Sequence, residues 1–97
     1  MASLIKIAQA GTLESSDIMI AVAPGSEGSG IIIELESIVM AQYGEDICLT
    51  LREIMAEQDC TDVYIKAVDR GALDCTIRAR VLTALCRAGA ALKEEML

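Results

Sequence analysis

The sequence contains no histidine, no phenylalanine and no tryptophan, and only two of its 97 residues are aromatic. The absence of histidine excludes Ser-His and Cys-His catalysis and any metal site that uses histidine. Basic residues are also few: eight lysines and arginines are outnumbered by fifteen acidic residues, which gives a net charge of −7. Such a chain lacks both the cations that neutralise phosphates and the aromatic rings that stack on bases, so a nucleic-acid-binding role is excluded.

Long hydrophobic segments are missing as well. The longest apolar run, residues 18–24, is far shorter than the ~20 residues that cross a bilayer. Lys6 interrupts the apolar residues near the start, so no export signal is predicted. The spacing of the cysteines matches no C-x-x-C pattern, and we expect unpaired, buried or half-buried thiols in a cytoplasmic protein, where disulfides are rare. The four cysteines are Cys48, Cys60, Cys75 and Cys86.

The pattern of apolar residues predicts three strands in one small domain. Because aromatic residues are scarce, aliphatic side chains must fill its core. Apolar runs at 18–23 and 31–35 flank the glycine- and serine-rich segment 24–30. This arrangement predicts two antiparallel strands joined by a long hairpin loop. A β-branched run at 63–68 predicts the third strand. Residues 4–7 are either a fourth strand at the edge of the sheet or a loose arm.

Two helices complete the predicted fold. Apolar residues recur at helical spacing over 38–58, with Ser37 as a candidate N-cap, and again over 73–88, with Asp74 in the first turn. The order β-β-α-β-α predicts an α+β sandwich: a mainly antiparallel sheet of three strands, or four, with both helices packed on one face. We expect the third strand to dock on the free edge of the first, which places residues 18–23 in the centre.

No segment offers the residues of a catalytic centre, because paired carboxylates, a P-loop and a nucleophile beside a base are all missing. One polar segment stands out, residues 11–17, which precede the first predicted strand and contain glycine and three hydroxyl groups. Its side chains form a local ST turn, or an outside enzyme modifies one of its serines. We expect residues 11–16 to be more mobile than the sheet, because such residues make few buried contacts.

Positive charge is concentrated late in the chain. Residues 1–62 carry two cations and eleven acids, whereas residues 63–97 carry six cations and four acids. The second predicted helix contains Arg78 and Arg80. These arginines either belong to a solvated face or hold an anion or an acidic partner, and the residues alone leave both readings open.

Three segments together resemble a known family. They read GTLESSDIMI at 11–20, DRGALDC at 69–75 and RAR at 78–80. In order, content and separation they resemble the acyl carrier protein (gamma) subunit of bacterial citrate lyase, over nearly the whole chain. The resemblance implies that Ser15 carries 2′-(5″-phosphoribosyl)-3′-dephospho-CoA through a phosphodiester. It also implies a carrier with no catalytic residues and no metal of its own.

The same resemblance implies the role and the partners. The carrier holds acetyl and citryl groups as thioesters for the alpha (transferase) and beta (lyase) subunits, which cleave citrate to acetate and oxaloacetate. A further implied partner is the enzyme that attaches the prosthetic group. Arg78 and Arg80 become candidates for contacting the prosthetic phosphates or a partner subunit.

The implied domain is one acyl carrier domain over 1–97, with 1–16 as the N-terminal arm and prosthetic-group loop and 90–97 as a frayed C-terminus. Two other functions stay open at this point. One is the carrier subunit of malonate decarboxylase, which uses the same kind of prosthetic group. The other is a non-catalytic α+β interaction module that pairs with another chain through an exposed sheet edge.

Overall fold

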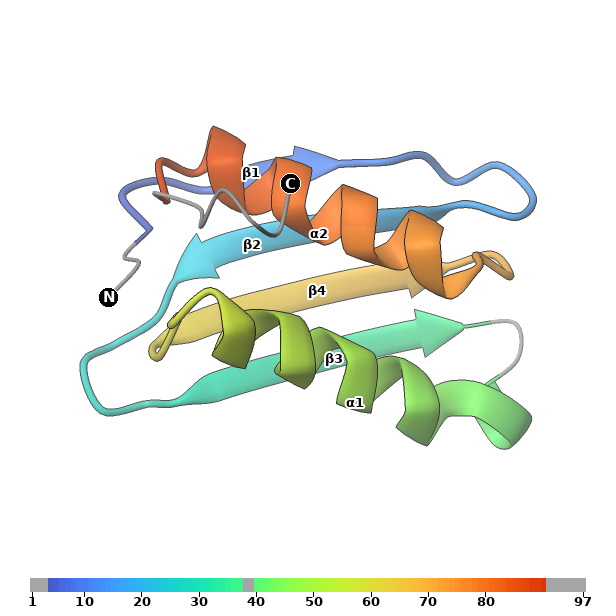
Figure 1. Cartoon of the computed structure of the whole chain (residues 1–97), viewed down its shortest axis with the longest axis horizontal. Helices are drawn as coiled ribbons and strands as arrows, with labels where there is room; N and C mark the ends of the chain where they lie inside the picture. The colour runs from blue at the N-terminus through green and yellow to red at the C-terminus, as the bar shows by residue number, and fades with distance from the viewer. Residues whose placement is uncertain (1–3, 38–39, 91–97) are drawn as a thin grey trace.

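A four-stranded sheet covered on one face by two helices makes up the computed structural model, which describes residues 4–37 and 40–90 (Figure 1). The predicted α+β architecture and the placement of both helices on one face are confirmed. Along the chain the elements are β1 (Ala8–Ala10), β2 (Ile18–Pro24), β3 (Ile31–Ser37), α1 (Met40–Glu57), β4 (Val63–Asp69) and α2 (Asp74–Arg87).

The order of the strands in the sheet is β1-β2-β4-β3, which corrects the expected order. β4 is antiparallel to β2 and parallel to β3. β2 is an interior strand, as expected. However, β4 lies between β2 and β3, so these two strands do not pair as a hairpin. Burial explains the choice: alternate residues of β4 are fully buried, whereas β3 is nowhere fully buried and carries Glu34 and Glu36. Charged side chains suit an edge strand, and the more apolar, more buried β4 suits the interior of the sheet.

The fourth strand is β1 at residues 8–10, which pairs antiparallel with β2. Residues 4–7 therefore form neither the edge strand nor a loose arm. The backbone N–H of Ile5 donates a hydrogen bond to the carbonyl of Ala88 at 2.9 Å, and Leu4 packs against the core. The start of the described chain is thus joined to the end of α2.

The core lies between the sheet and the two helices and consists of aliphatic side chains, as the shortage of aromatic residues predicts. Each fully buried Ile or Leu side chain contributes about 1.5–3 kcal/mol to stability through removal of apolar surface from water. The largest apolar side chains that are fully buried are Ile18, Ile20, Val22, Leu51, Ile54, Met55, Val63, Ile65, Ile77, Val81 and Leu85.

The helices begin and end close to the expected residues, with two exceptions at the boundaries. Ser37, the candidate N-cap, is the last residue of β3, and residues 38–39, which precede α1, lie outside the described part of the chain. The C-terminus was expected to fray over residues 90–97, of which 91–97 lie outside the described part of the chain.

All four cysteines have free thiols, in agreement with the expectation of no disulfide. Their burial differs from the expectation: Cys60 is buried and Cys48 is half-buried, but Cys75 and Cys86 are exposed. Both exposed cysteines are on α2, which buries one stripe of side chains against the sheet and leaves the opposite side in water. Over residues 4–37 and 40–90, no helix combines the length and the apolar character needed to cross a bilayer.

Candidate functional site

The loop of residues 11–17 connects β1 to β2 at the end of the sheet where β4 and β3 also finish (Figure 1). Gly11 begins this loop with a φ of +93°. A Cβ atom at this position would lie 1.9 Å from the carbonyl oxygen of Ile18. Glycine is therefore required, both for its positive φ and because the backbone of β2 is so close.

Ser15 and Ser16 occupy the two middle positions of a reverse turn. The backbone N–H of Asp17 donates to the carbonyl of Glu14 at 3.2 Å, and Ser16 has a φ of +63°. Both serines are exposed, and neither hydroxyl is hydrogen-bonded to any residue that the structure describes. The turn therefore presents two free hydroxyl groups to the solvent at its apex.

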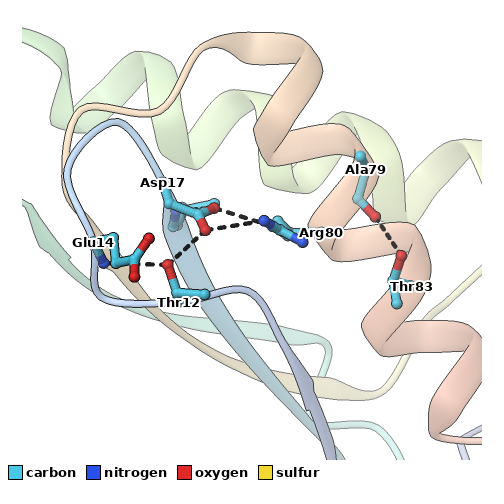
Figure 2. A network of polar contacts seen from close by, with 7 residues as sticks. Thr12, Glu14, Asp17, Ala79, Arg80 and Thr83 are labelled. Carbon is cyan, nitrogen blue, oxygen red and sulfur yellow. Dashed lines mark hydrogen bonds and ion pairs between the residues drawn. The ribbon is translucent and has the colours of Figure 1, made fainter.

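Asp17 anchors the loop to α2 (Figure 2). Arg80 donates from Nε to Asp17 Oδ1 at 3.0 Å and from Nη2 to Oδ2 at 2.9 Å. The hydroxyl of Thr12 donates to Asp17 Oδ2 at 2.7 Å, and the N–H of Ile18 donates to Oδ1 at 2.7 Å. The carboxylate thus accepts four hydrogen bonds, two of them in the bidentate geometry that favours Arg–carboxylate pairs.

This network changes the pKa of both charged partners. The pKa of Asp17 lies well below its usual range, because hydrogen bonds stabilise the charged carboxylate. The largest effect comes from Arg80, followed by Thr12 and the N–H of Ile18. The same contact with Asp17 raises the pKa of Arg80. Asp17 is buried while Glu14 stays exposed, so the two carboxylates that flank the serines differ in their environment.

The backbone of β4 holds the other side of the turn. The N–H of Ser16 donates to the carbonyl of Arg70 at 2.8 Å, and the N–H of Arg70 donates to the carbonyl of Asp17 at 2.9 Å. The loop of residues 11–17 is therefore fixed by α2 and by the end of β4. These are more contacts than the sequence indicated, and the greater mobility expected for residues 11–16 stays a prediction.

Asp69 organises the turn that follows β4. Its buried carboxylate accepts hydrogen bonds from the hydroxyl of Ser37 at 2.8 Å and from the N–H groups of Gly71 and Ala72 at 3.2 and 3.0 Å. These bonds fix the backbone on either side of Arg70 and tie the end of β3 to the same place. The turn that carries the serines thus rests on a second, well-bonded turn.

The two arginines singled out in the sequence are placed apart. Arg80 contacts Asp17 beside the serines, whereas Arg78 Nη1 contacts both carboxylate oxygens of Glu57 on α1 at 3.1 Å. Both guanidinium groups therefore already have a carboxylate partner. Their expected contact with phosphates or a partner subunit remains a prediction.

Arg70 is the residue that the sequence analysis missed. Its Nε atom is buried and has no hydrogen-bond partner among the described residues. In the sequence, Arg70 belongs to the segment DRGALDC, which contributes to the family resemblance but indicates no contact for this arginine. Its pairing with the 11–17 loop follows from the sheet register rather than from any local pattern. Thr12 was missed for the same reason, since its partner is fixed by the tertiary position of Asp17.

Comparison with known proteins identifies the family. Residues 5–88 match a family model described as the malonate decarboxylase delta subunit (MdcD). The citrate lyase acyl carrier protein of Streptococcus equi subsp. equi is 47% identical over 83 residues, which cover 86% of this chain and 80% of that protein. Citrate lyase acyl carrier protein 2 of Salmonella typhimurium is 48% identical over 85 residues, 88% of this chain and 87% of that protein. The chain belongs to the citrate lyase acyl carrier protein family.

Membership of this family confirms the resemblance seen in the sequence and makes the chain an acyl carrier, not an enzyme in its own right. Its fold also occurs in a crystal structure of a Pseudomonas malonate decarboxylase hetero-tetramer in complex with malonate. That match has a TM-score of 0.72 at 20% identity and covers 87% of this chain and 84% of the other. Across the described residues of the carrier, no group of three or more acidic or cysteine side chains is placed to hold a metal ion.

Proposed function

We propose that this chain is the acyl carrier subunit of citrate lyase and that Ser15 bears 2′-(5″-phosphoribosyl)-3′-dephospho-CoA through a phosphodiester. The observation that carries the proposal is the position of Ser15 at the apex of an exposed turn, in a chain 47–48% identical to named citrate lyase carriers. A serine that receives its group from an outside enzyme needs no base of its own. It needs an accessible hydroxyl on a defined backbone.

The residues around Ser15 fit an attached phosphodiester. Asp17 is paired with Arg80, so its charge is compensated and repels a phosphate attached to Ser15 only weakly. Glu14 is exposed to water, where its interaction with a phosphate is screened by solvent and salt. The attached group supplies a thiol for thioester formation, and the chain supplies the fixed point from which it extends.

The proposed cargo is an acetyl or citryl group held as a thioester and presented to the alpha and beta subunits that convert citrate to acetate and oxaloacetate. Covalent attachment replaces repeated bimolecular encounters by intramolecular ones at high effective concentration. This role requires the attachment enzyme as a further partner, and we place the complex in the cytoplasm.

A second candidate is the carrier subunit of malonate decarboxylase. It is favoured by the description of the matching family model and by the fold of the Pseudomonas complex. The latter match has only 20% sequence identity, whereas the two citrate lyase carriers have 47% and 48%. The citrate lyase assignment is therefore the stronger of the two. The interaction module considered in the sequence analysis has no comparable support.

Intact-mass measurement tests the proposal directly. The full chain is co-expressed with the enzymes that make and attach the citrate lyase prosthetic group, and we expect its mass to rise by one phosphoribosyl-dephospho-CoA unit. The modified, acetylated chain is then mixed with alpha and beta subunits of citrate lyase, or separately with the partner subunits of malonate decarboxylase. Oxaloacetate formed from citrate only in the first mixture supports the assignment. An unmodified mass contradicts the carrier proposal, and turnover of malonate alone reverses the choice between the two complexes.

A further inference from the structure

Arg70 is joined to the serine turn by its backbone alone. Its N–H and carbonyl form the two hydrogen bonds to Asp17 and Ser16, at 2.9 and 2.8 Å. These bonds place Arg70 beside the residue that follows Ser15. Asp69 holds this position from the other side, since it bonds the N–H groups of the two residues after Arg70. The long side chain of Arg70 therefore starts from a rigid backbone next to the attachment point.

The side chain of Arg70 lacks a partner that its chemistry requires. Nε is buried, yet no described residue accepts a hydrogen bond from it, and no ion pair of Arg70 occurs within residues 4–37 and 40–90. A buried donor without an acceptor is unfavourable, because its hydration is lost and nothing replaces it. The residue as a whole is half-buried, so part of Arg70 remains in contact with the solvent. This is the state of a donor whose acceptor lies outside the polypeptide.

The neighbouring charges point to the same residue. Arg80 is paired with Asp17 and Arg78 with Glu57, so the charge of each of these guanidinium groups is already balanced by a carboxylate. An open groove of about 710 Å³ lies between α1 and the turn after β4, but its charged lining residues are all acidic. They are Asp46, Glu53, Asp69 and Asp74. Phosphate groups are unfavourable there.

We propose that Arg70 binds the phosphodiester through which the prosthetic group is attached to Ser15. This inference rests on the proposed function and adds to it the residue that holds the root of the group. Guanidinium N–H donors match the oxygens of a phosphate in geometry and charge, and a bond from Nε satisfies its orphaned donor. The contact fixes the first atoms of the attached group beside the turn and leaves the remainder free to reach other subunits.

NMR of the full chain, with and without the prosthetic group, tests this contact. In the unmodified protein the Nε–Hε signal of Arg70 reports a donor without an acceptor. We expect modification to shift this signal to a higher proton chemical shift and to leave that of Arg80 nearly unchanged. The comparison uses the wild-type sequence, so it does not depend on whether a variant folds.

Variants give a second readout, the ³¹P signal of the phosphodiester. In modified Arg70→Gln this signal should move toward its position in the same protein unfolded in urea, and Arg70→Lys should give an intermediate value. Arg87→Gln is the matched control, because Arg87 is also an arginine but donates to the backbone carbonyl of Gln9 in β1. Its ³¹P signal should equal that of the wild type.

The outcomes separate this inference from the proposed function. A mass gain on Ser15 with no movement of the Arg70 Nε signal and no effect of Arg70→Gln on the ³¹P signal overturns the role of Arg70 and leaves the carrier function intact. A shift of the Arg80 signal instead assigns the phosphate to Arg80. Absence of any mass gain in the wild type removes the phosphodiester, and both proposals fail together.

Discussion

Replacing Gly11 by alanine should destabilise the protein more than the same replacement at Gly28. Both glycines have a positive φ, +93° and +82° respectively, so alanine is strained in both positions. They differ in the space around them. A Cβ atom at Gly28 meets nothing within 4 Å, whereas at Gly11 it would lie 1.9 Å from the carbonyl oxygen of Ile18. The pair therefore separates the cost of the backbone conformation from the cost of the close approach.

The expected magnitudes follow from these two contributions. A positive φ costs a residue with a Cβ about 1–2 kcal/mol, and the smaller freedom of alanine in the unfolded chain offsets about 0.4–1 kcal/mol of that. Gly28→Ala should therefore lose about 1 kcal/mol of unfolding free energy. Gly11→Ala adds about 1–3 kcal/mol for moving backbone out of the overlap, a total of about 2–4 kcal/mol. For a domain of this size, the melting temperature should fall by about 4–8 °C for Gly28→Ala and by roughly 10–30 °C for Gly11→Ala.

Urea denaturation at pH 7 followed by circular dichroism measures both variants under one condition. The second readout is the rate at which the attachment enzyme modifies Ser15, which should fall for Gly11→Ala and stay unchanged for Gly28→Ala. This is expected because Gly11 begins the loop that carries the serine, whereas Gly28 lies between β2 and β3. Equal losses of stability in the two variants would refute the claim that the backbone of β2 requires glycine at position 11.

Three further outcomes are expected. Ser15→Ala should abolish the mass gain and change the unfolding free energy by less than about 0.5 kcal/mol, as is usual for exposed side chains; if Ser16→Ala abolishes it instead, the attachment site is the neighbouring serine. The pKa of Asp17 lies below its ordinary value of 3.8, so its interactions stabilise the fold above that pH and are progressively lost below it. Asp17→Asn should accordingly be less stable than the wild type at pH 7 and lose less stability between pH 7 and pH 3 in urea titrations, and an unchanged pH dependence would argue against the Asp17 anchor. In a thiol-reagent assay without reductant, all four cysteines should react in the unfolded protein. In the folded protein the two exposed cysteines on α2 should react first and Cys60 last, because burial raises the pKa of its thiol. Rapid reaction of Cys60 in the folded state would contradict its buried position.

Much of the fold can be predicted from local patterns in the sequence. Apolar runs predict β2 and β3, a β-branched run predicts β4, and helical spacing predicts α1 and α2, each to within a few residues of the observed bounds. These patterns depend on near neighbours in the chain, because a side chain's face is set by the period of its own element. The turn with Ser15 is equally local, since glycine, threonine and two serines within residues 11–16 favour an exposed loop.

The sequence by itself therefore determined the elements, the α+β class, the acidic and non-catalytic character of the chain, and the serine loop. Only the tertiary structure decided that β4 lies between β2 and β3, that residues 8–10 form the fourth strand, and that Asp17 pairs with Arg80, 63 residues away. It also decided that Arg70 lies beside the serines with an unpartnered Nε. The physical reason is that strand order and long-range contacts depend on which faces the whole chain can bury at once, and no local pattern records that competition.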